Sequence, residues 1–291
     1  MTILSTLFLP VSILTSVVGF LYTRDTGGSM ETTILVASVL PLAIAMLLER
    51  WRPHRVEWGQ SLGDAATDWT SFAVLAGLVQ PVLKWVSPLV VVAIYGWVEA
   101  PVGSFFTGIP FVLQVLAVTL LAEFGKYWTH RWHHAVPFLW WLHALHHGSE
   151  RLYSINNFRV HPLEYAIKHV LSMLPIMLLG APTDAILGYV ALTQPVQMLQ
   201  HVNLPLRHGW LNYVFSTNTV HRRHHSTKQR EGDSNFGSAL LIWDQVFGTF
   251  HYRHEDGEPA SIGLYASTSY LAGQSFFKQV LSMFGLRCCL T

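Results

Sequence analysis

The chain has 291 residues, of which only 12% are charged and 51% are hydrophobic. Soluble globular chains carry about 25% charged residues, so this composition excludes an ordinary soluble enzyme, and the many aromatic side chains exclude intrinsic disorder. A net charge of +1 argues against nucleic acid as a partner, because phosphate binding requires an excess of basic side chains. Both cysteines of the chain, Cys288 and Cys289, are adjacent, which rules out a framework of disulfides and a cysteine-based zinc site.

Four apolar runs indicate membrane-spanning helices, each of which needs about 20 mostly apolar residues. The runs are residues 5–22, 32–48, 69–98 and a helix that begins at 109. The third run is unusually long and contains prolines. It is therefore compatible with one long kinked span or with a tight hairpin.

A further apolar stretch, residues 170–199, is interrupted by the polar turn sequence at 180–184. Each half is short for a full crossing. We expect a hairpin that dips into the membrane, with two short spans as the alternative.

Basic residues indicate the orientation of the chain. Arg50, Arg52 and Arg55 follow the second run, and the positive-inside rule places such a segment in the cytoplasm. If the third run crosses once, the histidine-rich half of the chain also faces the cytoplasm. The sequence thus predicts an all-α integral membrane protein with about four transmembrane helices and a cytoplasmic, helical, histidine-rich catalytic cap. Its predicted parts are a transmembrane region 1–108, a catalytic domain 109–255 and a C-terminal tail 256–291.

Histidine is the second unusual feature, with 16 residues. His130 and His134 are four apart, and the pattern HxxHH occurs twice, at 143–147 and at 221–225. On a helix these spacings place the imidazoles on one face, where several can converge on a metal. Imidazole suits iron, zinc, copper and nickel. Eight such histidines exceed what one ion binds, so the pattern predicts two neighbouring metal ions.

These histidines belong to an ordered series of motifs between about residues 121 and 251. The motifs are HRWHH at 130–134, LWWLHALHHGS at 139–149, RVHPLE at 159–164, HVN at 201–203, HRRHHS at 221–226 and WDQVFGT at 243–249. As a set they resemble the fatty acid hydroxylase/sterol desaturase superfamily. One departure is Ala135, where ether-lipid monooxygenases of that family tend to have Glu.

The resemblance implies an integral-membrane, non-haem di-iron enzyme that uses O2 to hydroxylate or desaturate a membrane lipid. It also implies an active site that faces the cytoplasm, in a bacterial inner membrane or the endoplasmic reticulum. The two iron ions would receive electrons from an external donor, such as cytochrome b5 or ferredoxin with a reductase. An external donor is consistent with the sequence, which has no G-x-G-x-x-G fingerprint after a strand.

The resemblance also assigns roles to individual residues. The metal ligands that it implies are His130, His134, His143, His146, His147, His221, His224 and His225, with His201 as a further ligand and His161 as a ligand or an outer partner. Asp244 is expected to hydrogen-bond a ligand or to cap a helix, and Asn203 to lie in the same outer layer. Arg159 and Glu164 are expected to be structural, either paired with each other or holding the loop of His161. His251 and His254 are expected in a solvated loop.

A competing interpretation is a histidine-rich membrane metal transporter or metal-binding protein. The histidine motifs lie in aromatic-rich, apparently helical segments beyond the last long span, which favours a fixed site over a mobile metal-binding loop. The lipid substrate stays open at this point, among fatty acyl chains, sterols, sphingolipids, ether lipids and carotenoids. Hydroxylation and desaturation also stay open.

Overall fold

The computed structural model describes residues 2–98, 105–253, 255, 257–265, 268–285 and 288–289. These residues form helices joined by loops, with two isolated β-bridges and no strand among them. The prediction of an all-α fold is confirmed.

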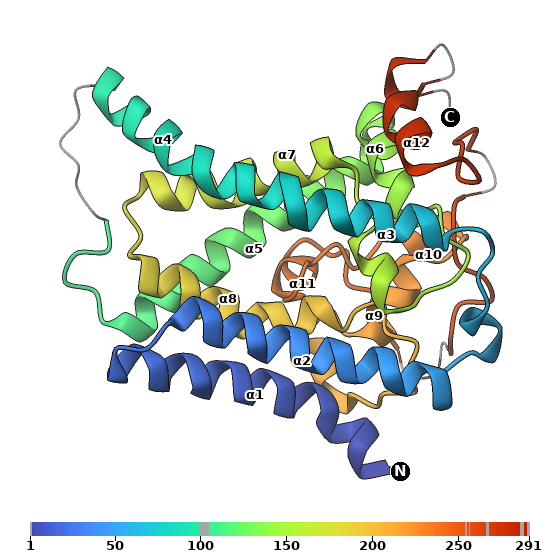
Figure 1. Cartoon of the computed structure of the whole chain (residues 1–291), viewed down its shortest axis with the longest axis horizontal. Coiled ribbons are helices and arrows are strands. Elements are labelled where there is room, and N and C mark those ends of the chain that lie inside the picture. Colours follow the sequence, from blue (N-terminus) through green and yellow to red (C-terminus); the bar gives the residue numbers. More distant parts are fainter. Residues whose placement is uncertain are drawn as a thin grey trace.

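Four helices in the described residues are long and apolar enough to cross a membrane. They are α1 (Thr2–Thr26), α2 (Met30–Trp51), the continuous run of α3 (Ala65–Val74), η2 (Leu75–Val79) and α4 (Gln80–Val98), and α5 (Phe111–Ala135). The long helices lie side by side (Figure 1). Their exposed apolar side chains are those that a bilayer would cover.

The third candidate span settles one of the open alternatives. Residues 65–97 form one helical run of 33 residues, so the hairpin within 69–98 is wrong. The run contains a π-helical turn, Leu75–Val79, which inserts an extra residue into the helical ladder without ending it. Pro88 lies inside the helix that follows, where a missing N–H bends a helix without necessarily breaking it.

A shorter helical hairpin lies among these spans. It consists of α7 (Pro162–Leu178) and α8 (Thr183–Met198), and it turns at Gly180, whose φ of 72° is easily adopted only by glycine. Its tip reaches the far end of the bundle, because Asp184 lies 3.3 Å from the Arg24 guanidinium at the end of α1. The depth of this hairpin in a membrane, and the three-part division of the chain, stay predictions.

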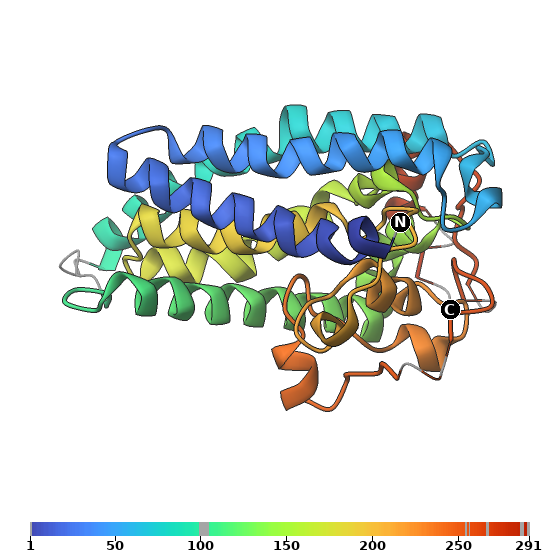
Figure 2. The same ribbon diagram turned by 90° about the horizontal axis from the view of Figure 1, so that it is seen from below.

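The remaining elements gather at the opposite end of the bundle, close to both termini (Figures 1 and 2). We call this end the histidine end. Its elements are η1 (Val56–Gly59), α6 (Pro137–His147), η3 (Ser154–Phe158), η4 (Gly209–Tyr213), α9 (Asn218–His224), α10 (Gln229–Gly232), α11 (Ile242–Val246), α12 (Phe276–Leu281) and η6 (Ser282–Phe284).

Two ion pairs fasten the third span to the histidine end. The Arg151 guanidinium lies 2.8 Å from Asp64, just before α3, and Arg159 lies 3.3 Å from Asp68, one turn later. The Arg159 and Asp68 side chains are both buried. Because removal of one partner would leave a buried unpaired charge, which is strongly destabilising, these pairs fix the position of the loop after α6.

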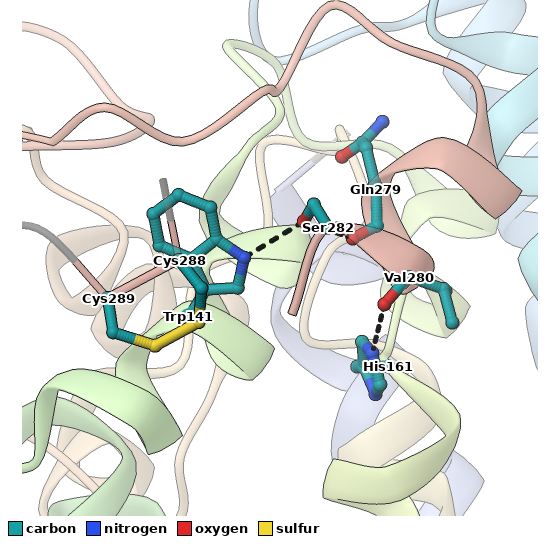
Figure 3. Close-up of a disulfide and its surroundings, with 7 residues drawn as sticks. All are labelled: Trp141, His161, Gln279, Val280, Ser282, Cys288 and Cys289. Atoms are coloured by element: carbon teal, nitrogen blue, oxygen red, sulfur yellow. Dashed lines mark hydrogen bonds between the residues drawn. A yellow bond between two sulfur atoms is a disulfide. The ribbon is translucent and has the colours of Figure 1, made fainter. Parts of the chain in front are cut away.

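The C-terminal segment covers the outer side of α6. Trp141 donates a hydrogen bond from its indole nitrogen to Ser282 Oγ at 2.9 Å (Figure 3). Cys288 and Cys289 form a disulfide with each other and pack against the same aromatic cluster. A disulfide between neighbouring residues closes no long loop, so it adds little of the chain-entropy stabilisation that other disulfides give.

The packing of α5 on α7 generates a first prediction. A Cβ added at Gly125 would lie 2.5 Å from the carbonyl oxygen of Leu171 and 2.8 Å from the Cα of Ser172. Gly125→Ala should therefore push the two helices apart and lower the free energy of unfolding by about 1–3 kcal/mol, measured as a lower melting temperature in detergent. The matched control is Gly96→Ala in α4, where an added Cβ meets no atom within 4 Å. Equal melting temperatures for the two variants would contradict the close approach.

Candidate metal centre

Nine histidines gather in two clusters at the histidine end. The first cluster contains His130 and His134 of α5, His143 and His147 of α6, and His224 of α9. The second cluster contains His146 of α6, His201 after α8, His221 of α9, and His225 directly after α9. Within each cluster the potential ligand atoms all lie within 4.8 Å of one another.

The HxxHH spacing explains why the two clusters adjoin. In α6 and α9 the histidines lie on one helical face, and each helix supplies side chains to both clusters. The rings of His147 and His225, one from each cluster, have centroids 4.3 Å apart. The arrangement therefore offers two neighbouring sites rather than one large one.

The outer nitrogens of the first cluster determine where its protons lie. His130 Nδ1 is 2.8 Å from the carbonyl oxygen of Phe236, and His143 Nδ1 is 2.8 Å from Glu164 Oε1. A carbonyl and a carboxylate only accept hydrogen bonds, so both Nδ1 atoms carry the proton. Both Nε2 atoms then present a lone pair toward the centre of the cluster.

These lone pairs provide a test of whether a metal fits. The Nε2 atoms of His130 and His143 lie only 3.0 Å apart, although neither has a proton to donate to the other. His134 Nε2 is buried with no hydrogen-bond partner among the described residues, while its Nδ1 donates to Asp233. A cation among the lone pairs would satisfy all three atoms. The residues present therefore fit a metal ion held by nitrogen ligands.

Two histidines of the second cluster are oriented in the same way, whereas the buried Nδ1 atoms of His221 and His225 have no hydrogen-bond partner among the described residues. His146 Nδ1 donates to the carbonyl oxygen of Arg159 at 3.1 Å, and His201 Nδ1 donates to Asn156 Oδ1 at 2.9 Å. His201 Nε2 then faces His221 Nε2 at 3.0 Å. Such outer partners fix the tautomer and orientation of metal-binding histidines.

Burial keeps the imidazoles in the form that binds a metal. Desolvation lowers the pKa of the seven cluster histidines outside α5, and it lowers the pKa of His146 to about 4. At neutral pH these rings carry no charge. Protons therefore compete weakly with a metal for their lone pairs.

The loop before α11 carries two carbonyl oxygens that accept from cluster histidines, Phe236 O from His130 of α5 and Ser234 O from His224 of α9. Buried carboxylates hold this loop in place. The Asp244 carboxylate accepts hydrogen bonds from the backbone N–H groups of Phe236 and Gly237, each at 2.7 Å. The buried Glu123 of α5 accepts two more, from Ala239 and Leu240. Asp244 thus makes no direct hydrogen bond to a cluster histidine. It holds the backbone of Phe236, and the carbonyl oxygen of Phe236 accepts from His130.

Some residues expected near the metals lie elsewhere. His161 caps α7, because its Nδ1 accepts from Leu163 N and its Nε2 donates to the carbonyl oxygen of Val280 (Figure 3). It belongs to neither cluster. Asn203 bonds the backbone of Arg55 and contacts no cluster histidine in the described residues. His251 is also outside both clusters, and His254 lies outside the described residues.

Arg159 and Glu164 are not paired with each other in the way the sequence suggested. Arg159 pairs with Asp68 and donates to the carbonyl oxygen of Leu145, which makes it structural as expected. Glu164 instead accepts the Nδ1 proton of His143. The structure therefore moves Glu164 from a purely structural role to the orientation of a candidate ligand.

Two residues that hold the outer nitrogens of cluster histidines were missed by the sequence analysis. They are Asp233, which lies 3.0 Å from His134 Nδ1, and Asn156, which lies 2.9 Å from His201 Nδ1. They are 99 and 45 residues away from their partners. Asp233 follows the third histidine motif within eight residues, which is a weak signal. No sequence pattern singles out Asn156.

Comparison with known proteins agrees with this geometry. The family model described as fatty acid hydroxylase matches residues 115–249, which contain all nine cluster histidines. The chain therefore contains a fatty acid hydroxylase domain. It is 36% identical over 217 residues to an ornithine lipid hydroxylase of Rhizobium tropici, a match that covers 72% of this chain and 64% of that protein. No solved structure matches the chain.

More distant relatives have related names. An alkylglycerol monooxygenase of Homo sapiens is 29% identical over 133 residues, which cover 46% of this chain and 29% of that protein. A methylsterol monooxygenase of Rattus norvegicus is 26% identical over 158 residues, which cover 53% of this chain and 50% of that protein. The chain thus spans less than two thirds of the length of these relatives. Their names describe lipid oxygenases, and they do not support the alternative of a metal transporter.

Removal of an outer acceptor should weaken metal binding. Asp233→Ala deprives His134 of the partner that holds its Nδ1 proton, so metal affinity should fall by about 10- to 100-fold. The measurement is metal retained by the purified protein during titration with a chelator. Asp184→Ala, at the far end of the bundle, is the matched control and should retain metal like the unaltered chain. Equal retention by both variants would exclude the orienting role of Asp233.

A buried histidine outside the clusters predicts a pH dependence of stability. His208 donates from Nε2 to Asn218 Oδ1 at the start of α9, and burial lowers the pKa of His208 to about 4. The unfolded chain, with a histidine pKa of about 6.5, binds the proton first as the pH falls. The free energy of unfolding should therefore drop between pH 6.5 and 4, by about 3 kcal/mol for this residue.

The His208→Gln variant isolates this contribution. Glutamine has no group that titrates in this range, so the variant should lose less stability than the unaltered chain between pH 6.5 and 4. The measurement is chemical unfolding in detergent at several pH values. Parallel pH profiles for the two proteins would show that His208 does not contribute.

Proposed function

We propose that this protein is a membrane-bound oxygenase that uses O2 and external electrons to hydroxylate a C–H bond of a membrane lipid. The observation that carries the proposal is the pair of adjoining, all-imidazole clusters at one end of a bundle of apolar helices. The names of the relatives, which are hydroxylases and monooxygenases of lipids, support hydroxylation over desaturation.

The two clusters would hold two iron ions. The first would bind to His130, His134, His143, His147 and His224, and the second to His146, His201, His221 and His225. Bound iron would supply the activation of O2 that an unactivated C–H bond requires. His161, which caps α7 with both ring nitrogens engaged, is not part of this ligand set.

The residues of the chain have three tasks in such a reaction. The outer acceptors Asp233, Glu164 and Asn156 hold the Nδ1 protons of their histidines and so keep the Nε2 lone pairs directed inward. Burial of the clusters excludes bulk water, which protects a reactive oxidant from side reactions. The surrounding spans give an apolar lipid access to a polar centre without a passage through water.

We propose the lipid substrate from the names of the relatives and from Ala135, the residue at which this chain departs from the ether-lipid enzymes of the family. Ornithine lipid is the first candidate, because the relative from Rhizobium tropici is an ornithine lipid hydroxylase and its match extends over 72% of this chain. Ether lipids are a second candidate, supported by the alkylglycerol monooxygenases. Ala135, which ends α5 where ether-lipid enzymes of the family tend to have Glu, favours the first candidate.

The arrangement of charges supports a cytoplasmic centre. Arg50, Arg52 and Arg55 lie at or just after the end of α2, the same end that carries the clusters, because Glu49 of α2 contacts Ser154 there. Basic segments of this kind face the cytoplasm. A soluble or membrane-bound carrier, such as ferredoxin or cytochrome b5 with its reductase, could then deliver electrons from that side.

Oxidation of ornithine lipid under labelled O2 tests the proposed function. Cells that contain the chain, but not cells with His146→Ala, should form a lipid that has gained one labelled oxygen atom. His169→Ala is the control, since His169 hydrogen-bonds Ser87 between α7 and α4 and lies in neither cluster. A second arm supplies alkylglycerol lipids. The proposal would be refuted if cells with iron-loaded protein formed no labelled product from ornithine lipid and none from alkylglycerol lipids.

A further inference from the structure

A cavity next to the histidine clusters lies where α2 ends and the third span begins. Its volume is about 430 Å³. Its walls come from the end of α2, the segment with η1, the first turns of α3 and the loop before η3. Its apolar walls include Met46, Val56, Trp58, Trp69 and Ile155. Its polar lining includes Glu49, Arg50, Arg151, Tyr153, Ser154 and Asn203.

The cavity lies at the ends of two candidate membrane spans. It lies where the candidate span Met30–Trp51 ends and the candidate span Ala65–Trp97 begins. The exposed rings of Trp51 and Trp69 flank this level of the bundle, and tryptophan is enriched where hydrocarbon meets the headgroup layer. The cavity reaches the surface, because Arg50 and Trp69 are both exposed.

Two ionisable side chains of this cavity, Glu49 and Arg50, have no ion pair within the described residues. Glu49 Oε1 accepts hydrogen bonds from Ser154 and Asn203, whereas its Oε2 accepts only one long bond of 3.4 Å, from Ser154 N. Arg50 is exposed and has no ion pair or side-chain hydrogen bond within the part of the chain that the structure describes. Arg151, by contrast, is occupied by Asp64 and by the carbonyl oxygen of Trp58.

The cavity and the second histidine cluster draw residues from the same two chain segments. Ser154 lines the cavity, and two residues later Asn156 accepts the Nδ1 proton of His201. Asn203 lines the cavity from the other segment, two residues after His201 itself. Since two residues of chain span at most about 7 Å, a headgroup in the cavity would lie close to the candidate metal site.

We propose that this cavity binds the headgroup of a zwitterionic lipid, one that carries both an ammonium and an anionic group. Glu49 Oε2 accepts the ammonium, and the Arg50 guanidinium binds the carboxylate or phosphate. The aromatic and aliphatic walls contact the adjoining part of the acyl chains. The role of this lipid as substrate rests on the proposed function, but its binding does not. Ornithine lipid and phosphatidylethanolamine are two sources of this headgroup chemistry.

Lipid binding to the purified, metal-containing protein tests the site without turnover. Native mass spectrometry from neutral maltoside micelles counts bound lipid during titration with four probes. The probes are ornithine lipid, phosphatidylethanolamine, anionic phosphatidylglycerol and uncharged diacylglycerol. At least one of the two zwitterionic lipids should bind more tightly than phosphatidylglycerol and diacylglycerol, and the tighter of the two identifies the source of the headgroup.

Two substitutions connect this binding to the cavity. Glu49→Gln and Arg50→Gln should each weaken binding of the preferred lipid by roughly 10- to 100-fold, the value of one hydrogen bond to a charged group. Metal content should remain unchanged, because neither side chain contacts a cluster histidine. Glu31→Gln, an exposed glutamate in the first turn of the same helix, is the matched control and should bind lipid normally. Because Arg50 is exposed, Arg50→Gln should fold normally, so that lost lipid binding in this variant cannot result from misfolding.

The outcomes separate the two proposals. Equal binding of the four lipids, or unaltered binding by both cavity variants, would overturn the headgroup site even if the protein oxidises a lipid. Selective binding that depends on Glu49 and Arg50 supports the site. If a lipid that binds in this way is never oxidised, its role as substrate fails while the headgroup site stands.

Discussion

The burial of nine neutral imidazoles, with their lone pairs directed at one another, is the constraint on which the rest of this structure depends. An unpaired buried polar atom costs free energy, and lone pairs 3.0 Å apart repel. Six of the nine outer nitrogens have acceptors, which are carboxylates, an amide and backbone carbonyls. The Nδ1 atoms of His147, His221 and His225 have no partner among the described residues. The charges that hold these acceptors in place, including Glu123 and Asp244, are themselves buried and hydrogen-bonded.

The long helices themselves carry and anchor the residues of the candidate metal centre. The last candidate span, α5, continues without a break into the helical turns that carry His130 and His134. The third span begins with Asp64 and Asp68, which anchor the loop after α6. Because the spans position the candidate ligands directly, the proposed lipid substrate would reach the centre without leaving an apolar environment. The cavity at Glu49 and Arg50 lies where two candidate spans end and begin, next to the segments that carry the second histidine cluster.

Helical periodicity made the histidines of the candidate site predictable from the sequence, but not their hydrogen-bond partners. HxxHH places three imidazoles on one face whatever the fold, and the motif order added His201. Periodicity says nothing about which acceptor meets an outer nitrogen. Asp233 and Asn156 were therefore missed, and Glu164 was assigned to structure although it orients His143. His161 was expected as a ligand or outer partner, yet it caps α7, where the following proline and leucine begin the helix.

The sequence by itself determined the fold class, the apolar spans and eight of the nine cluster histidines, because apolar length and helical spacing are local properties of the chain. It left open whether residues 69–98 turn back, since proline bends some helices and ends others, and the structure shows one helical run. Only the tertiary structure decided how nine histidines divide into two clusters and which residues support them. Those contacts join segments up to about a hundred residues apart, and they exist only after the helices have packed.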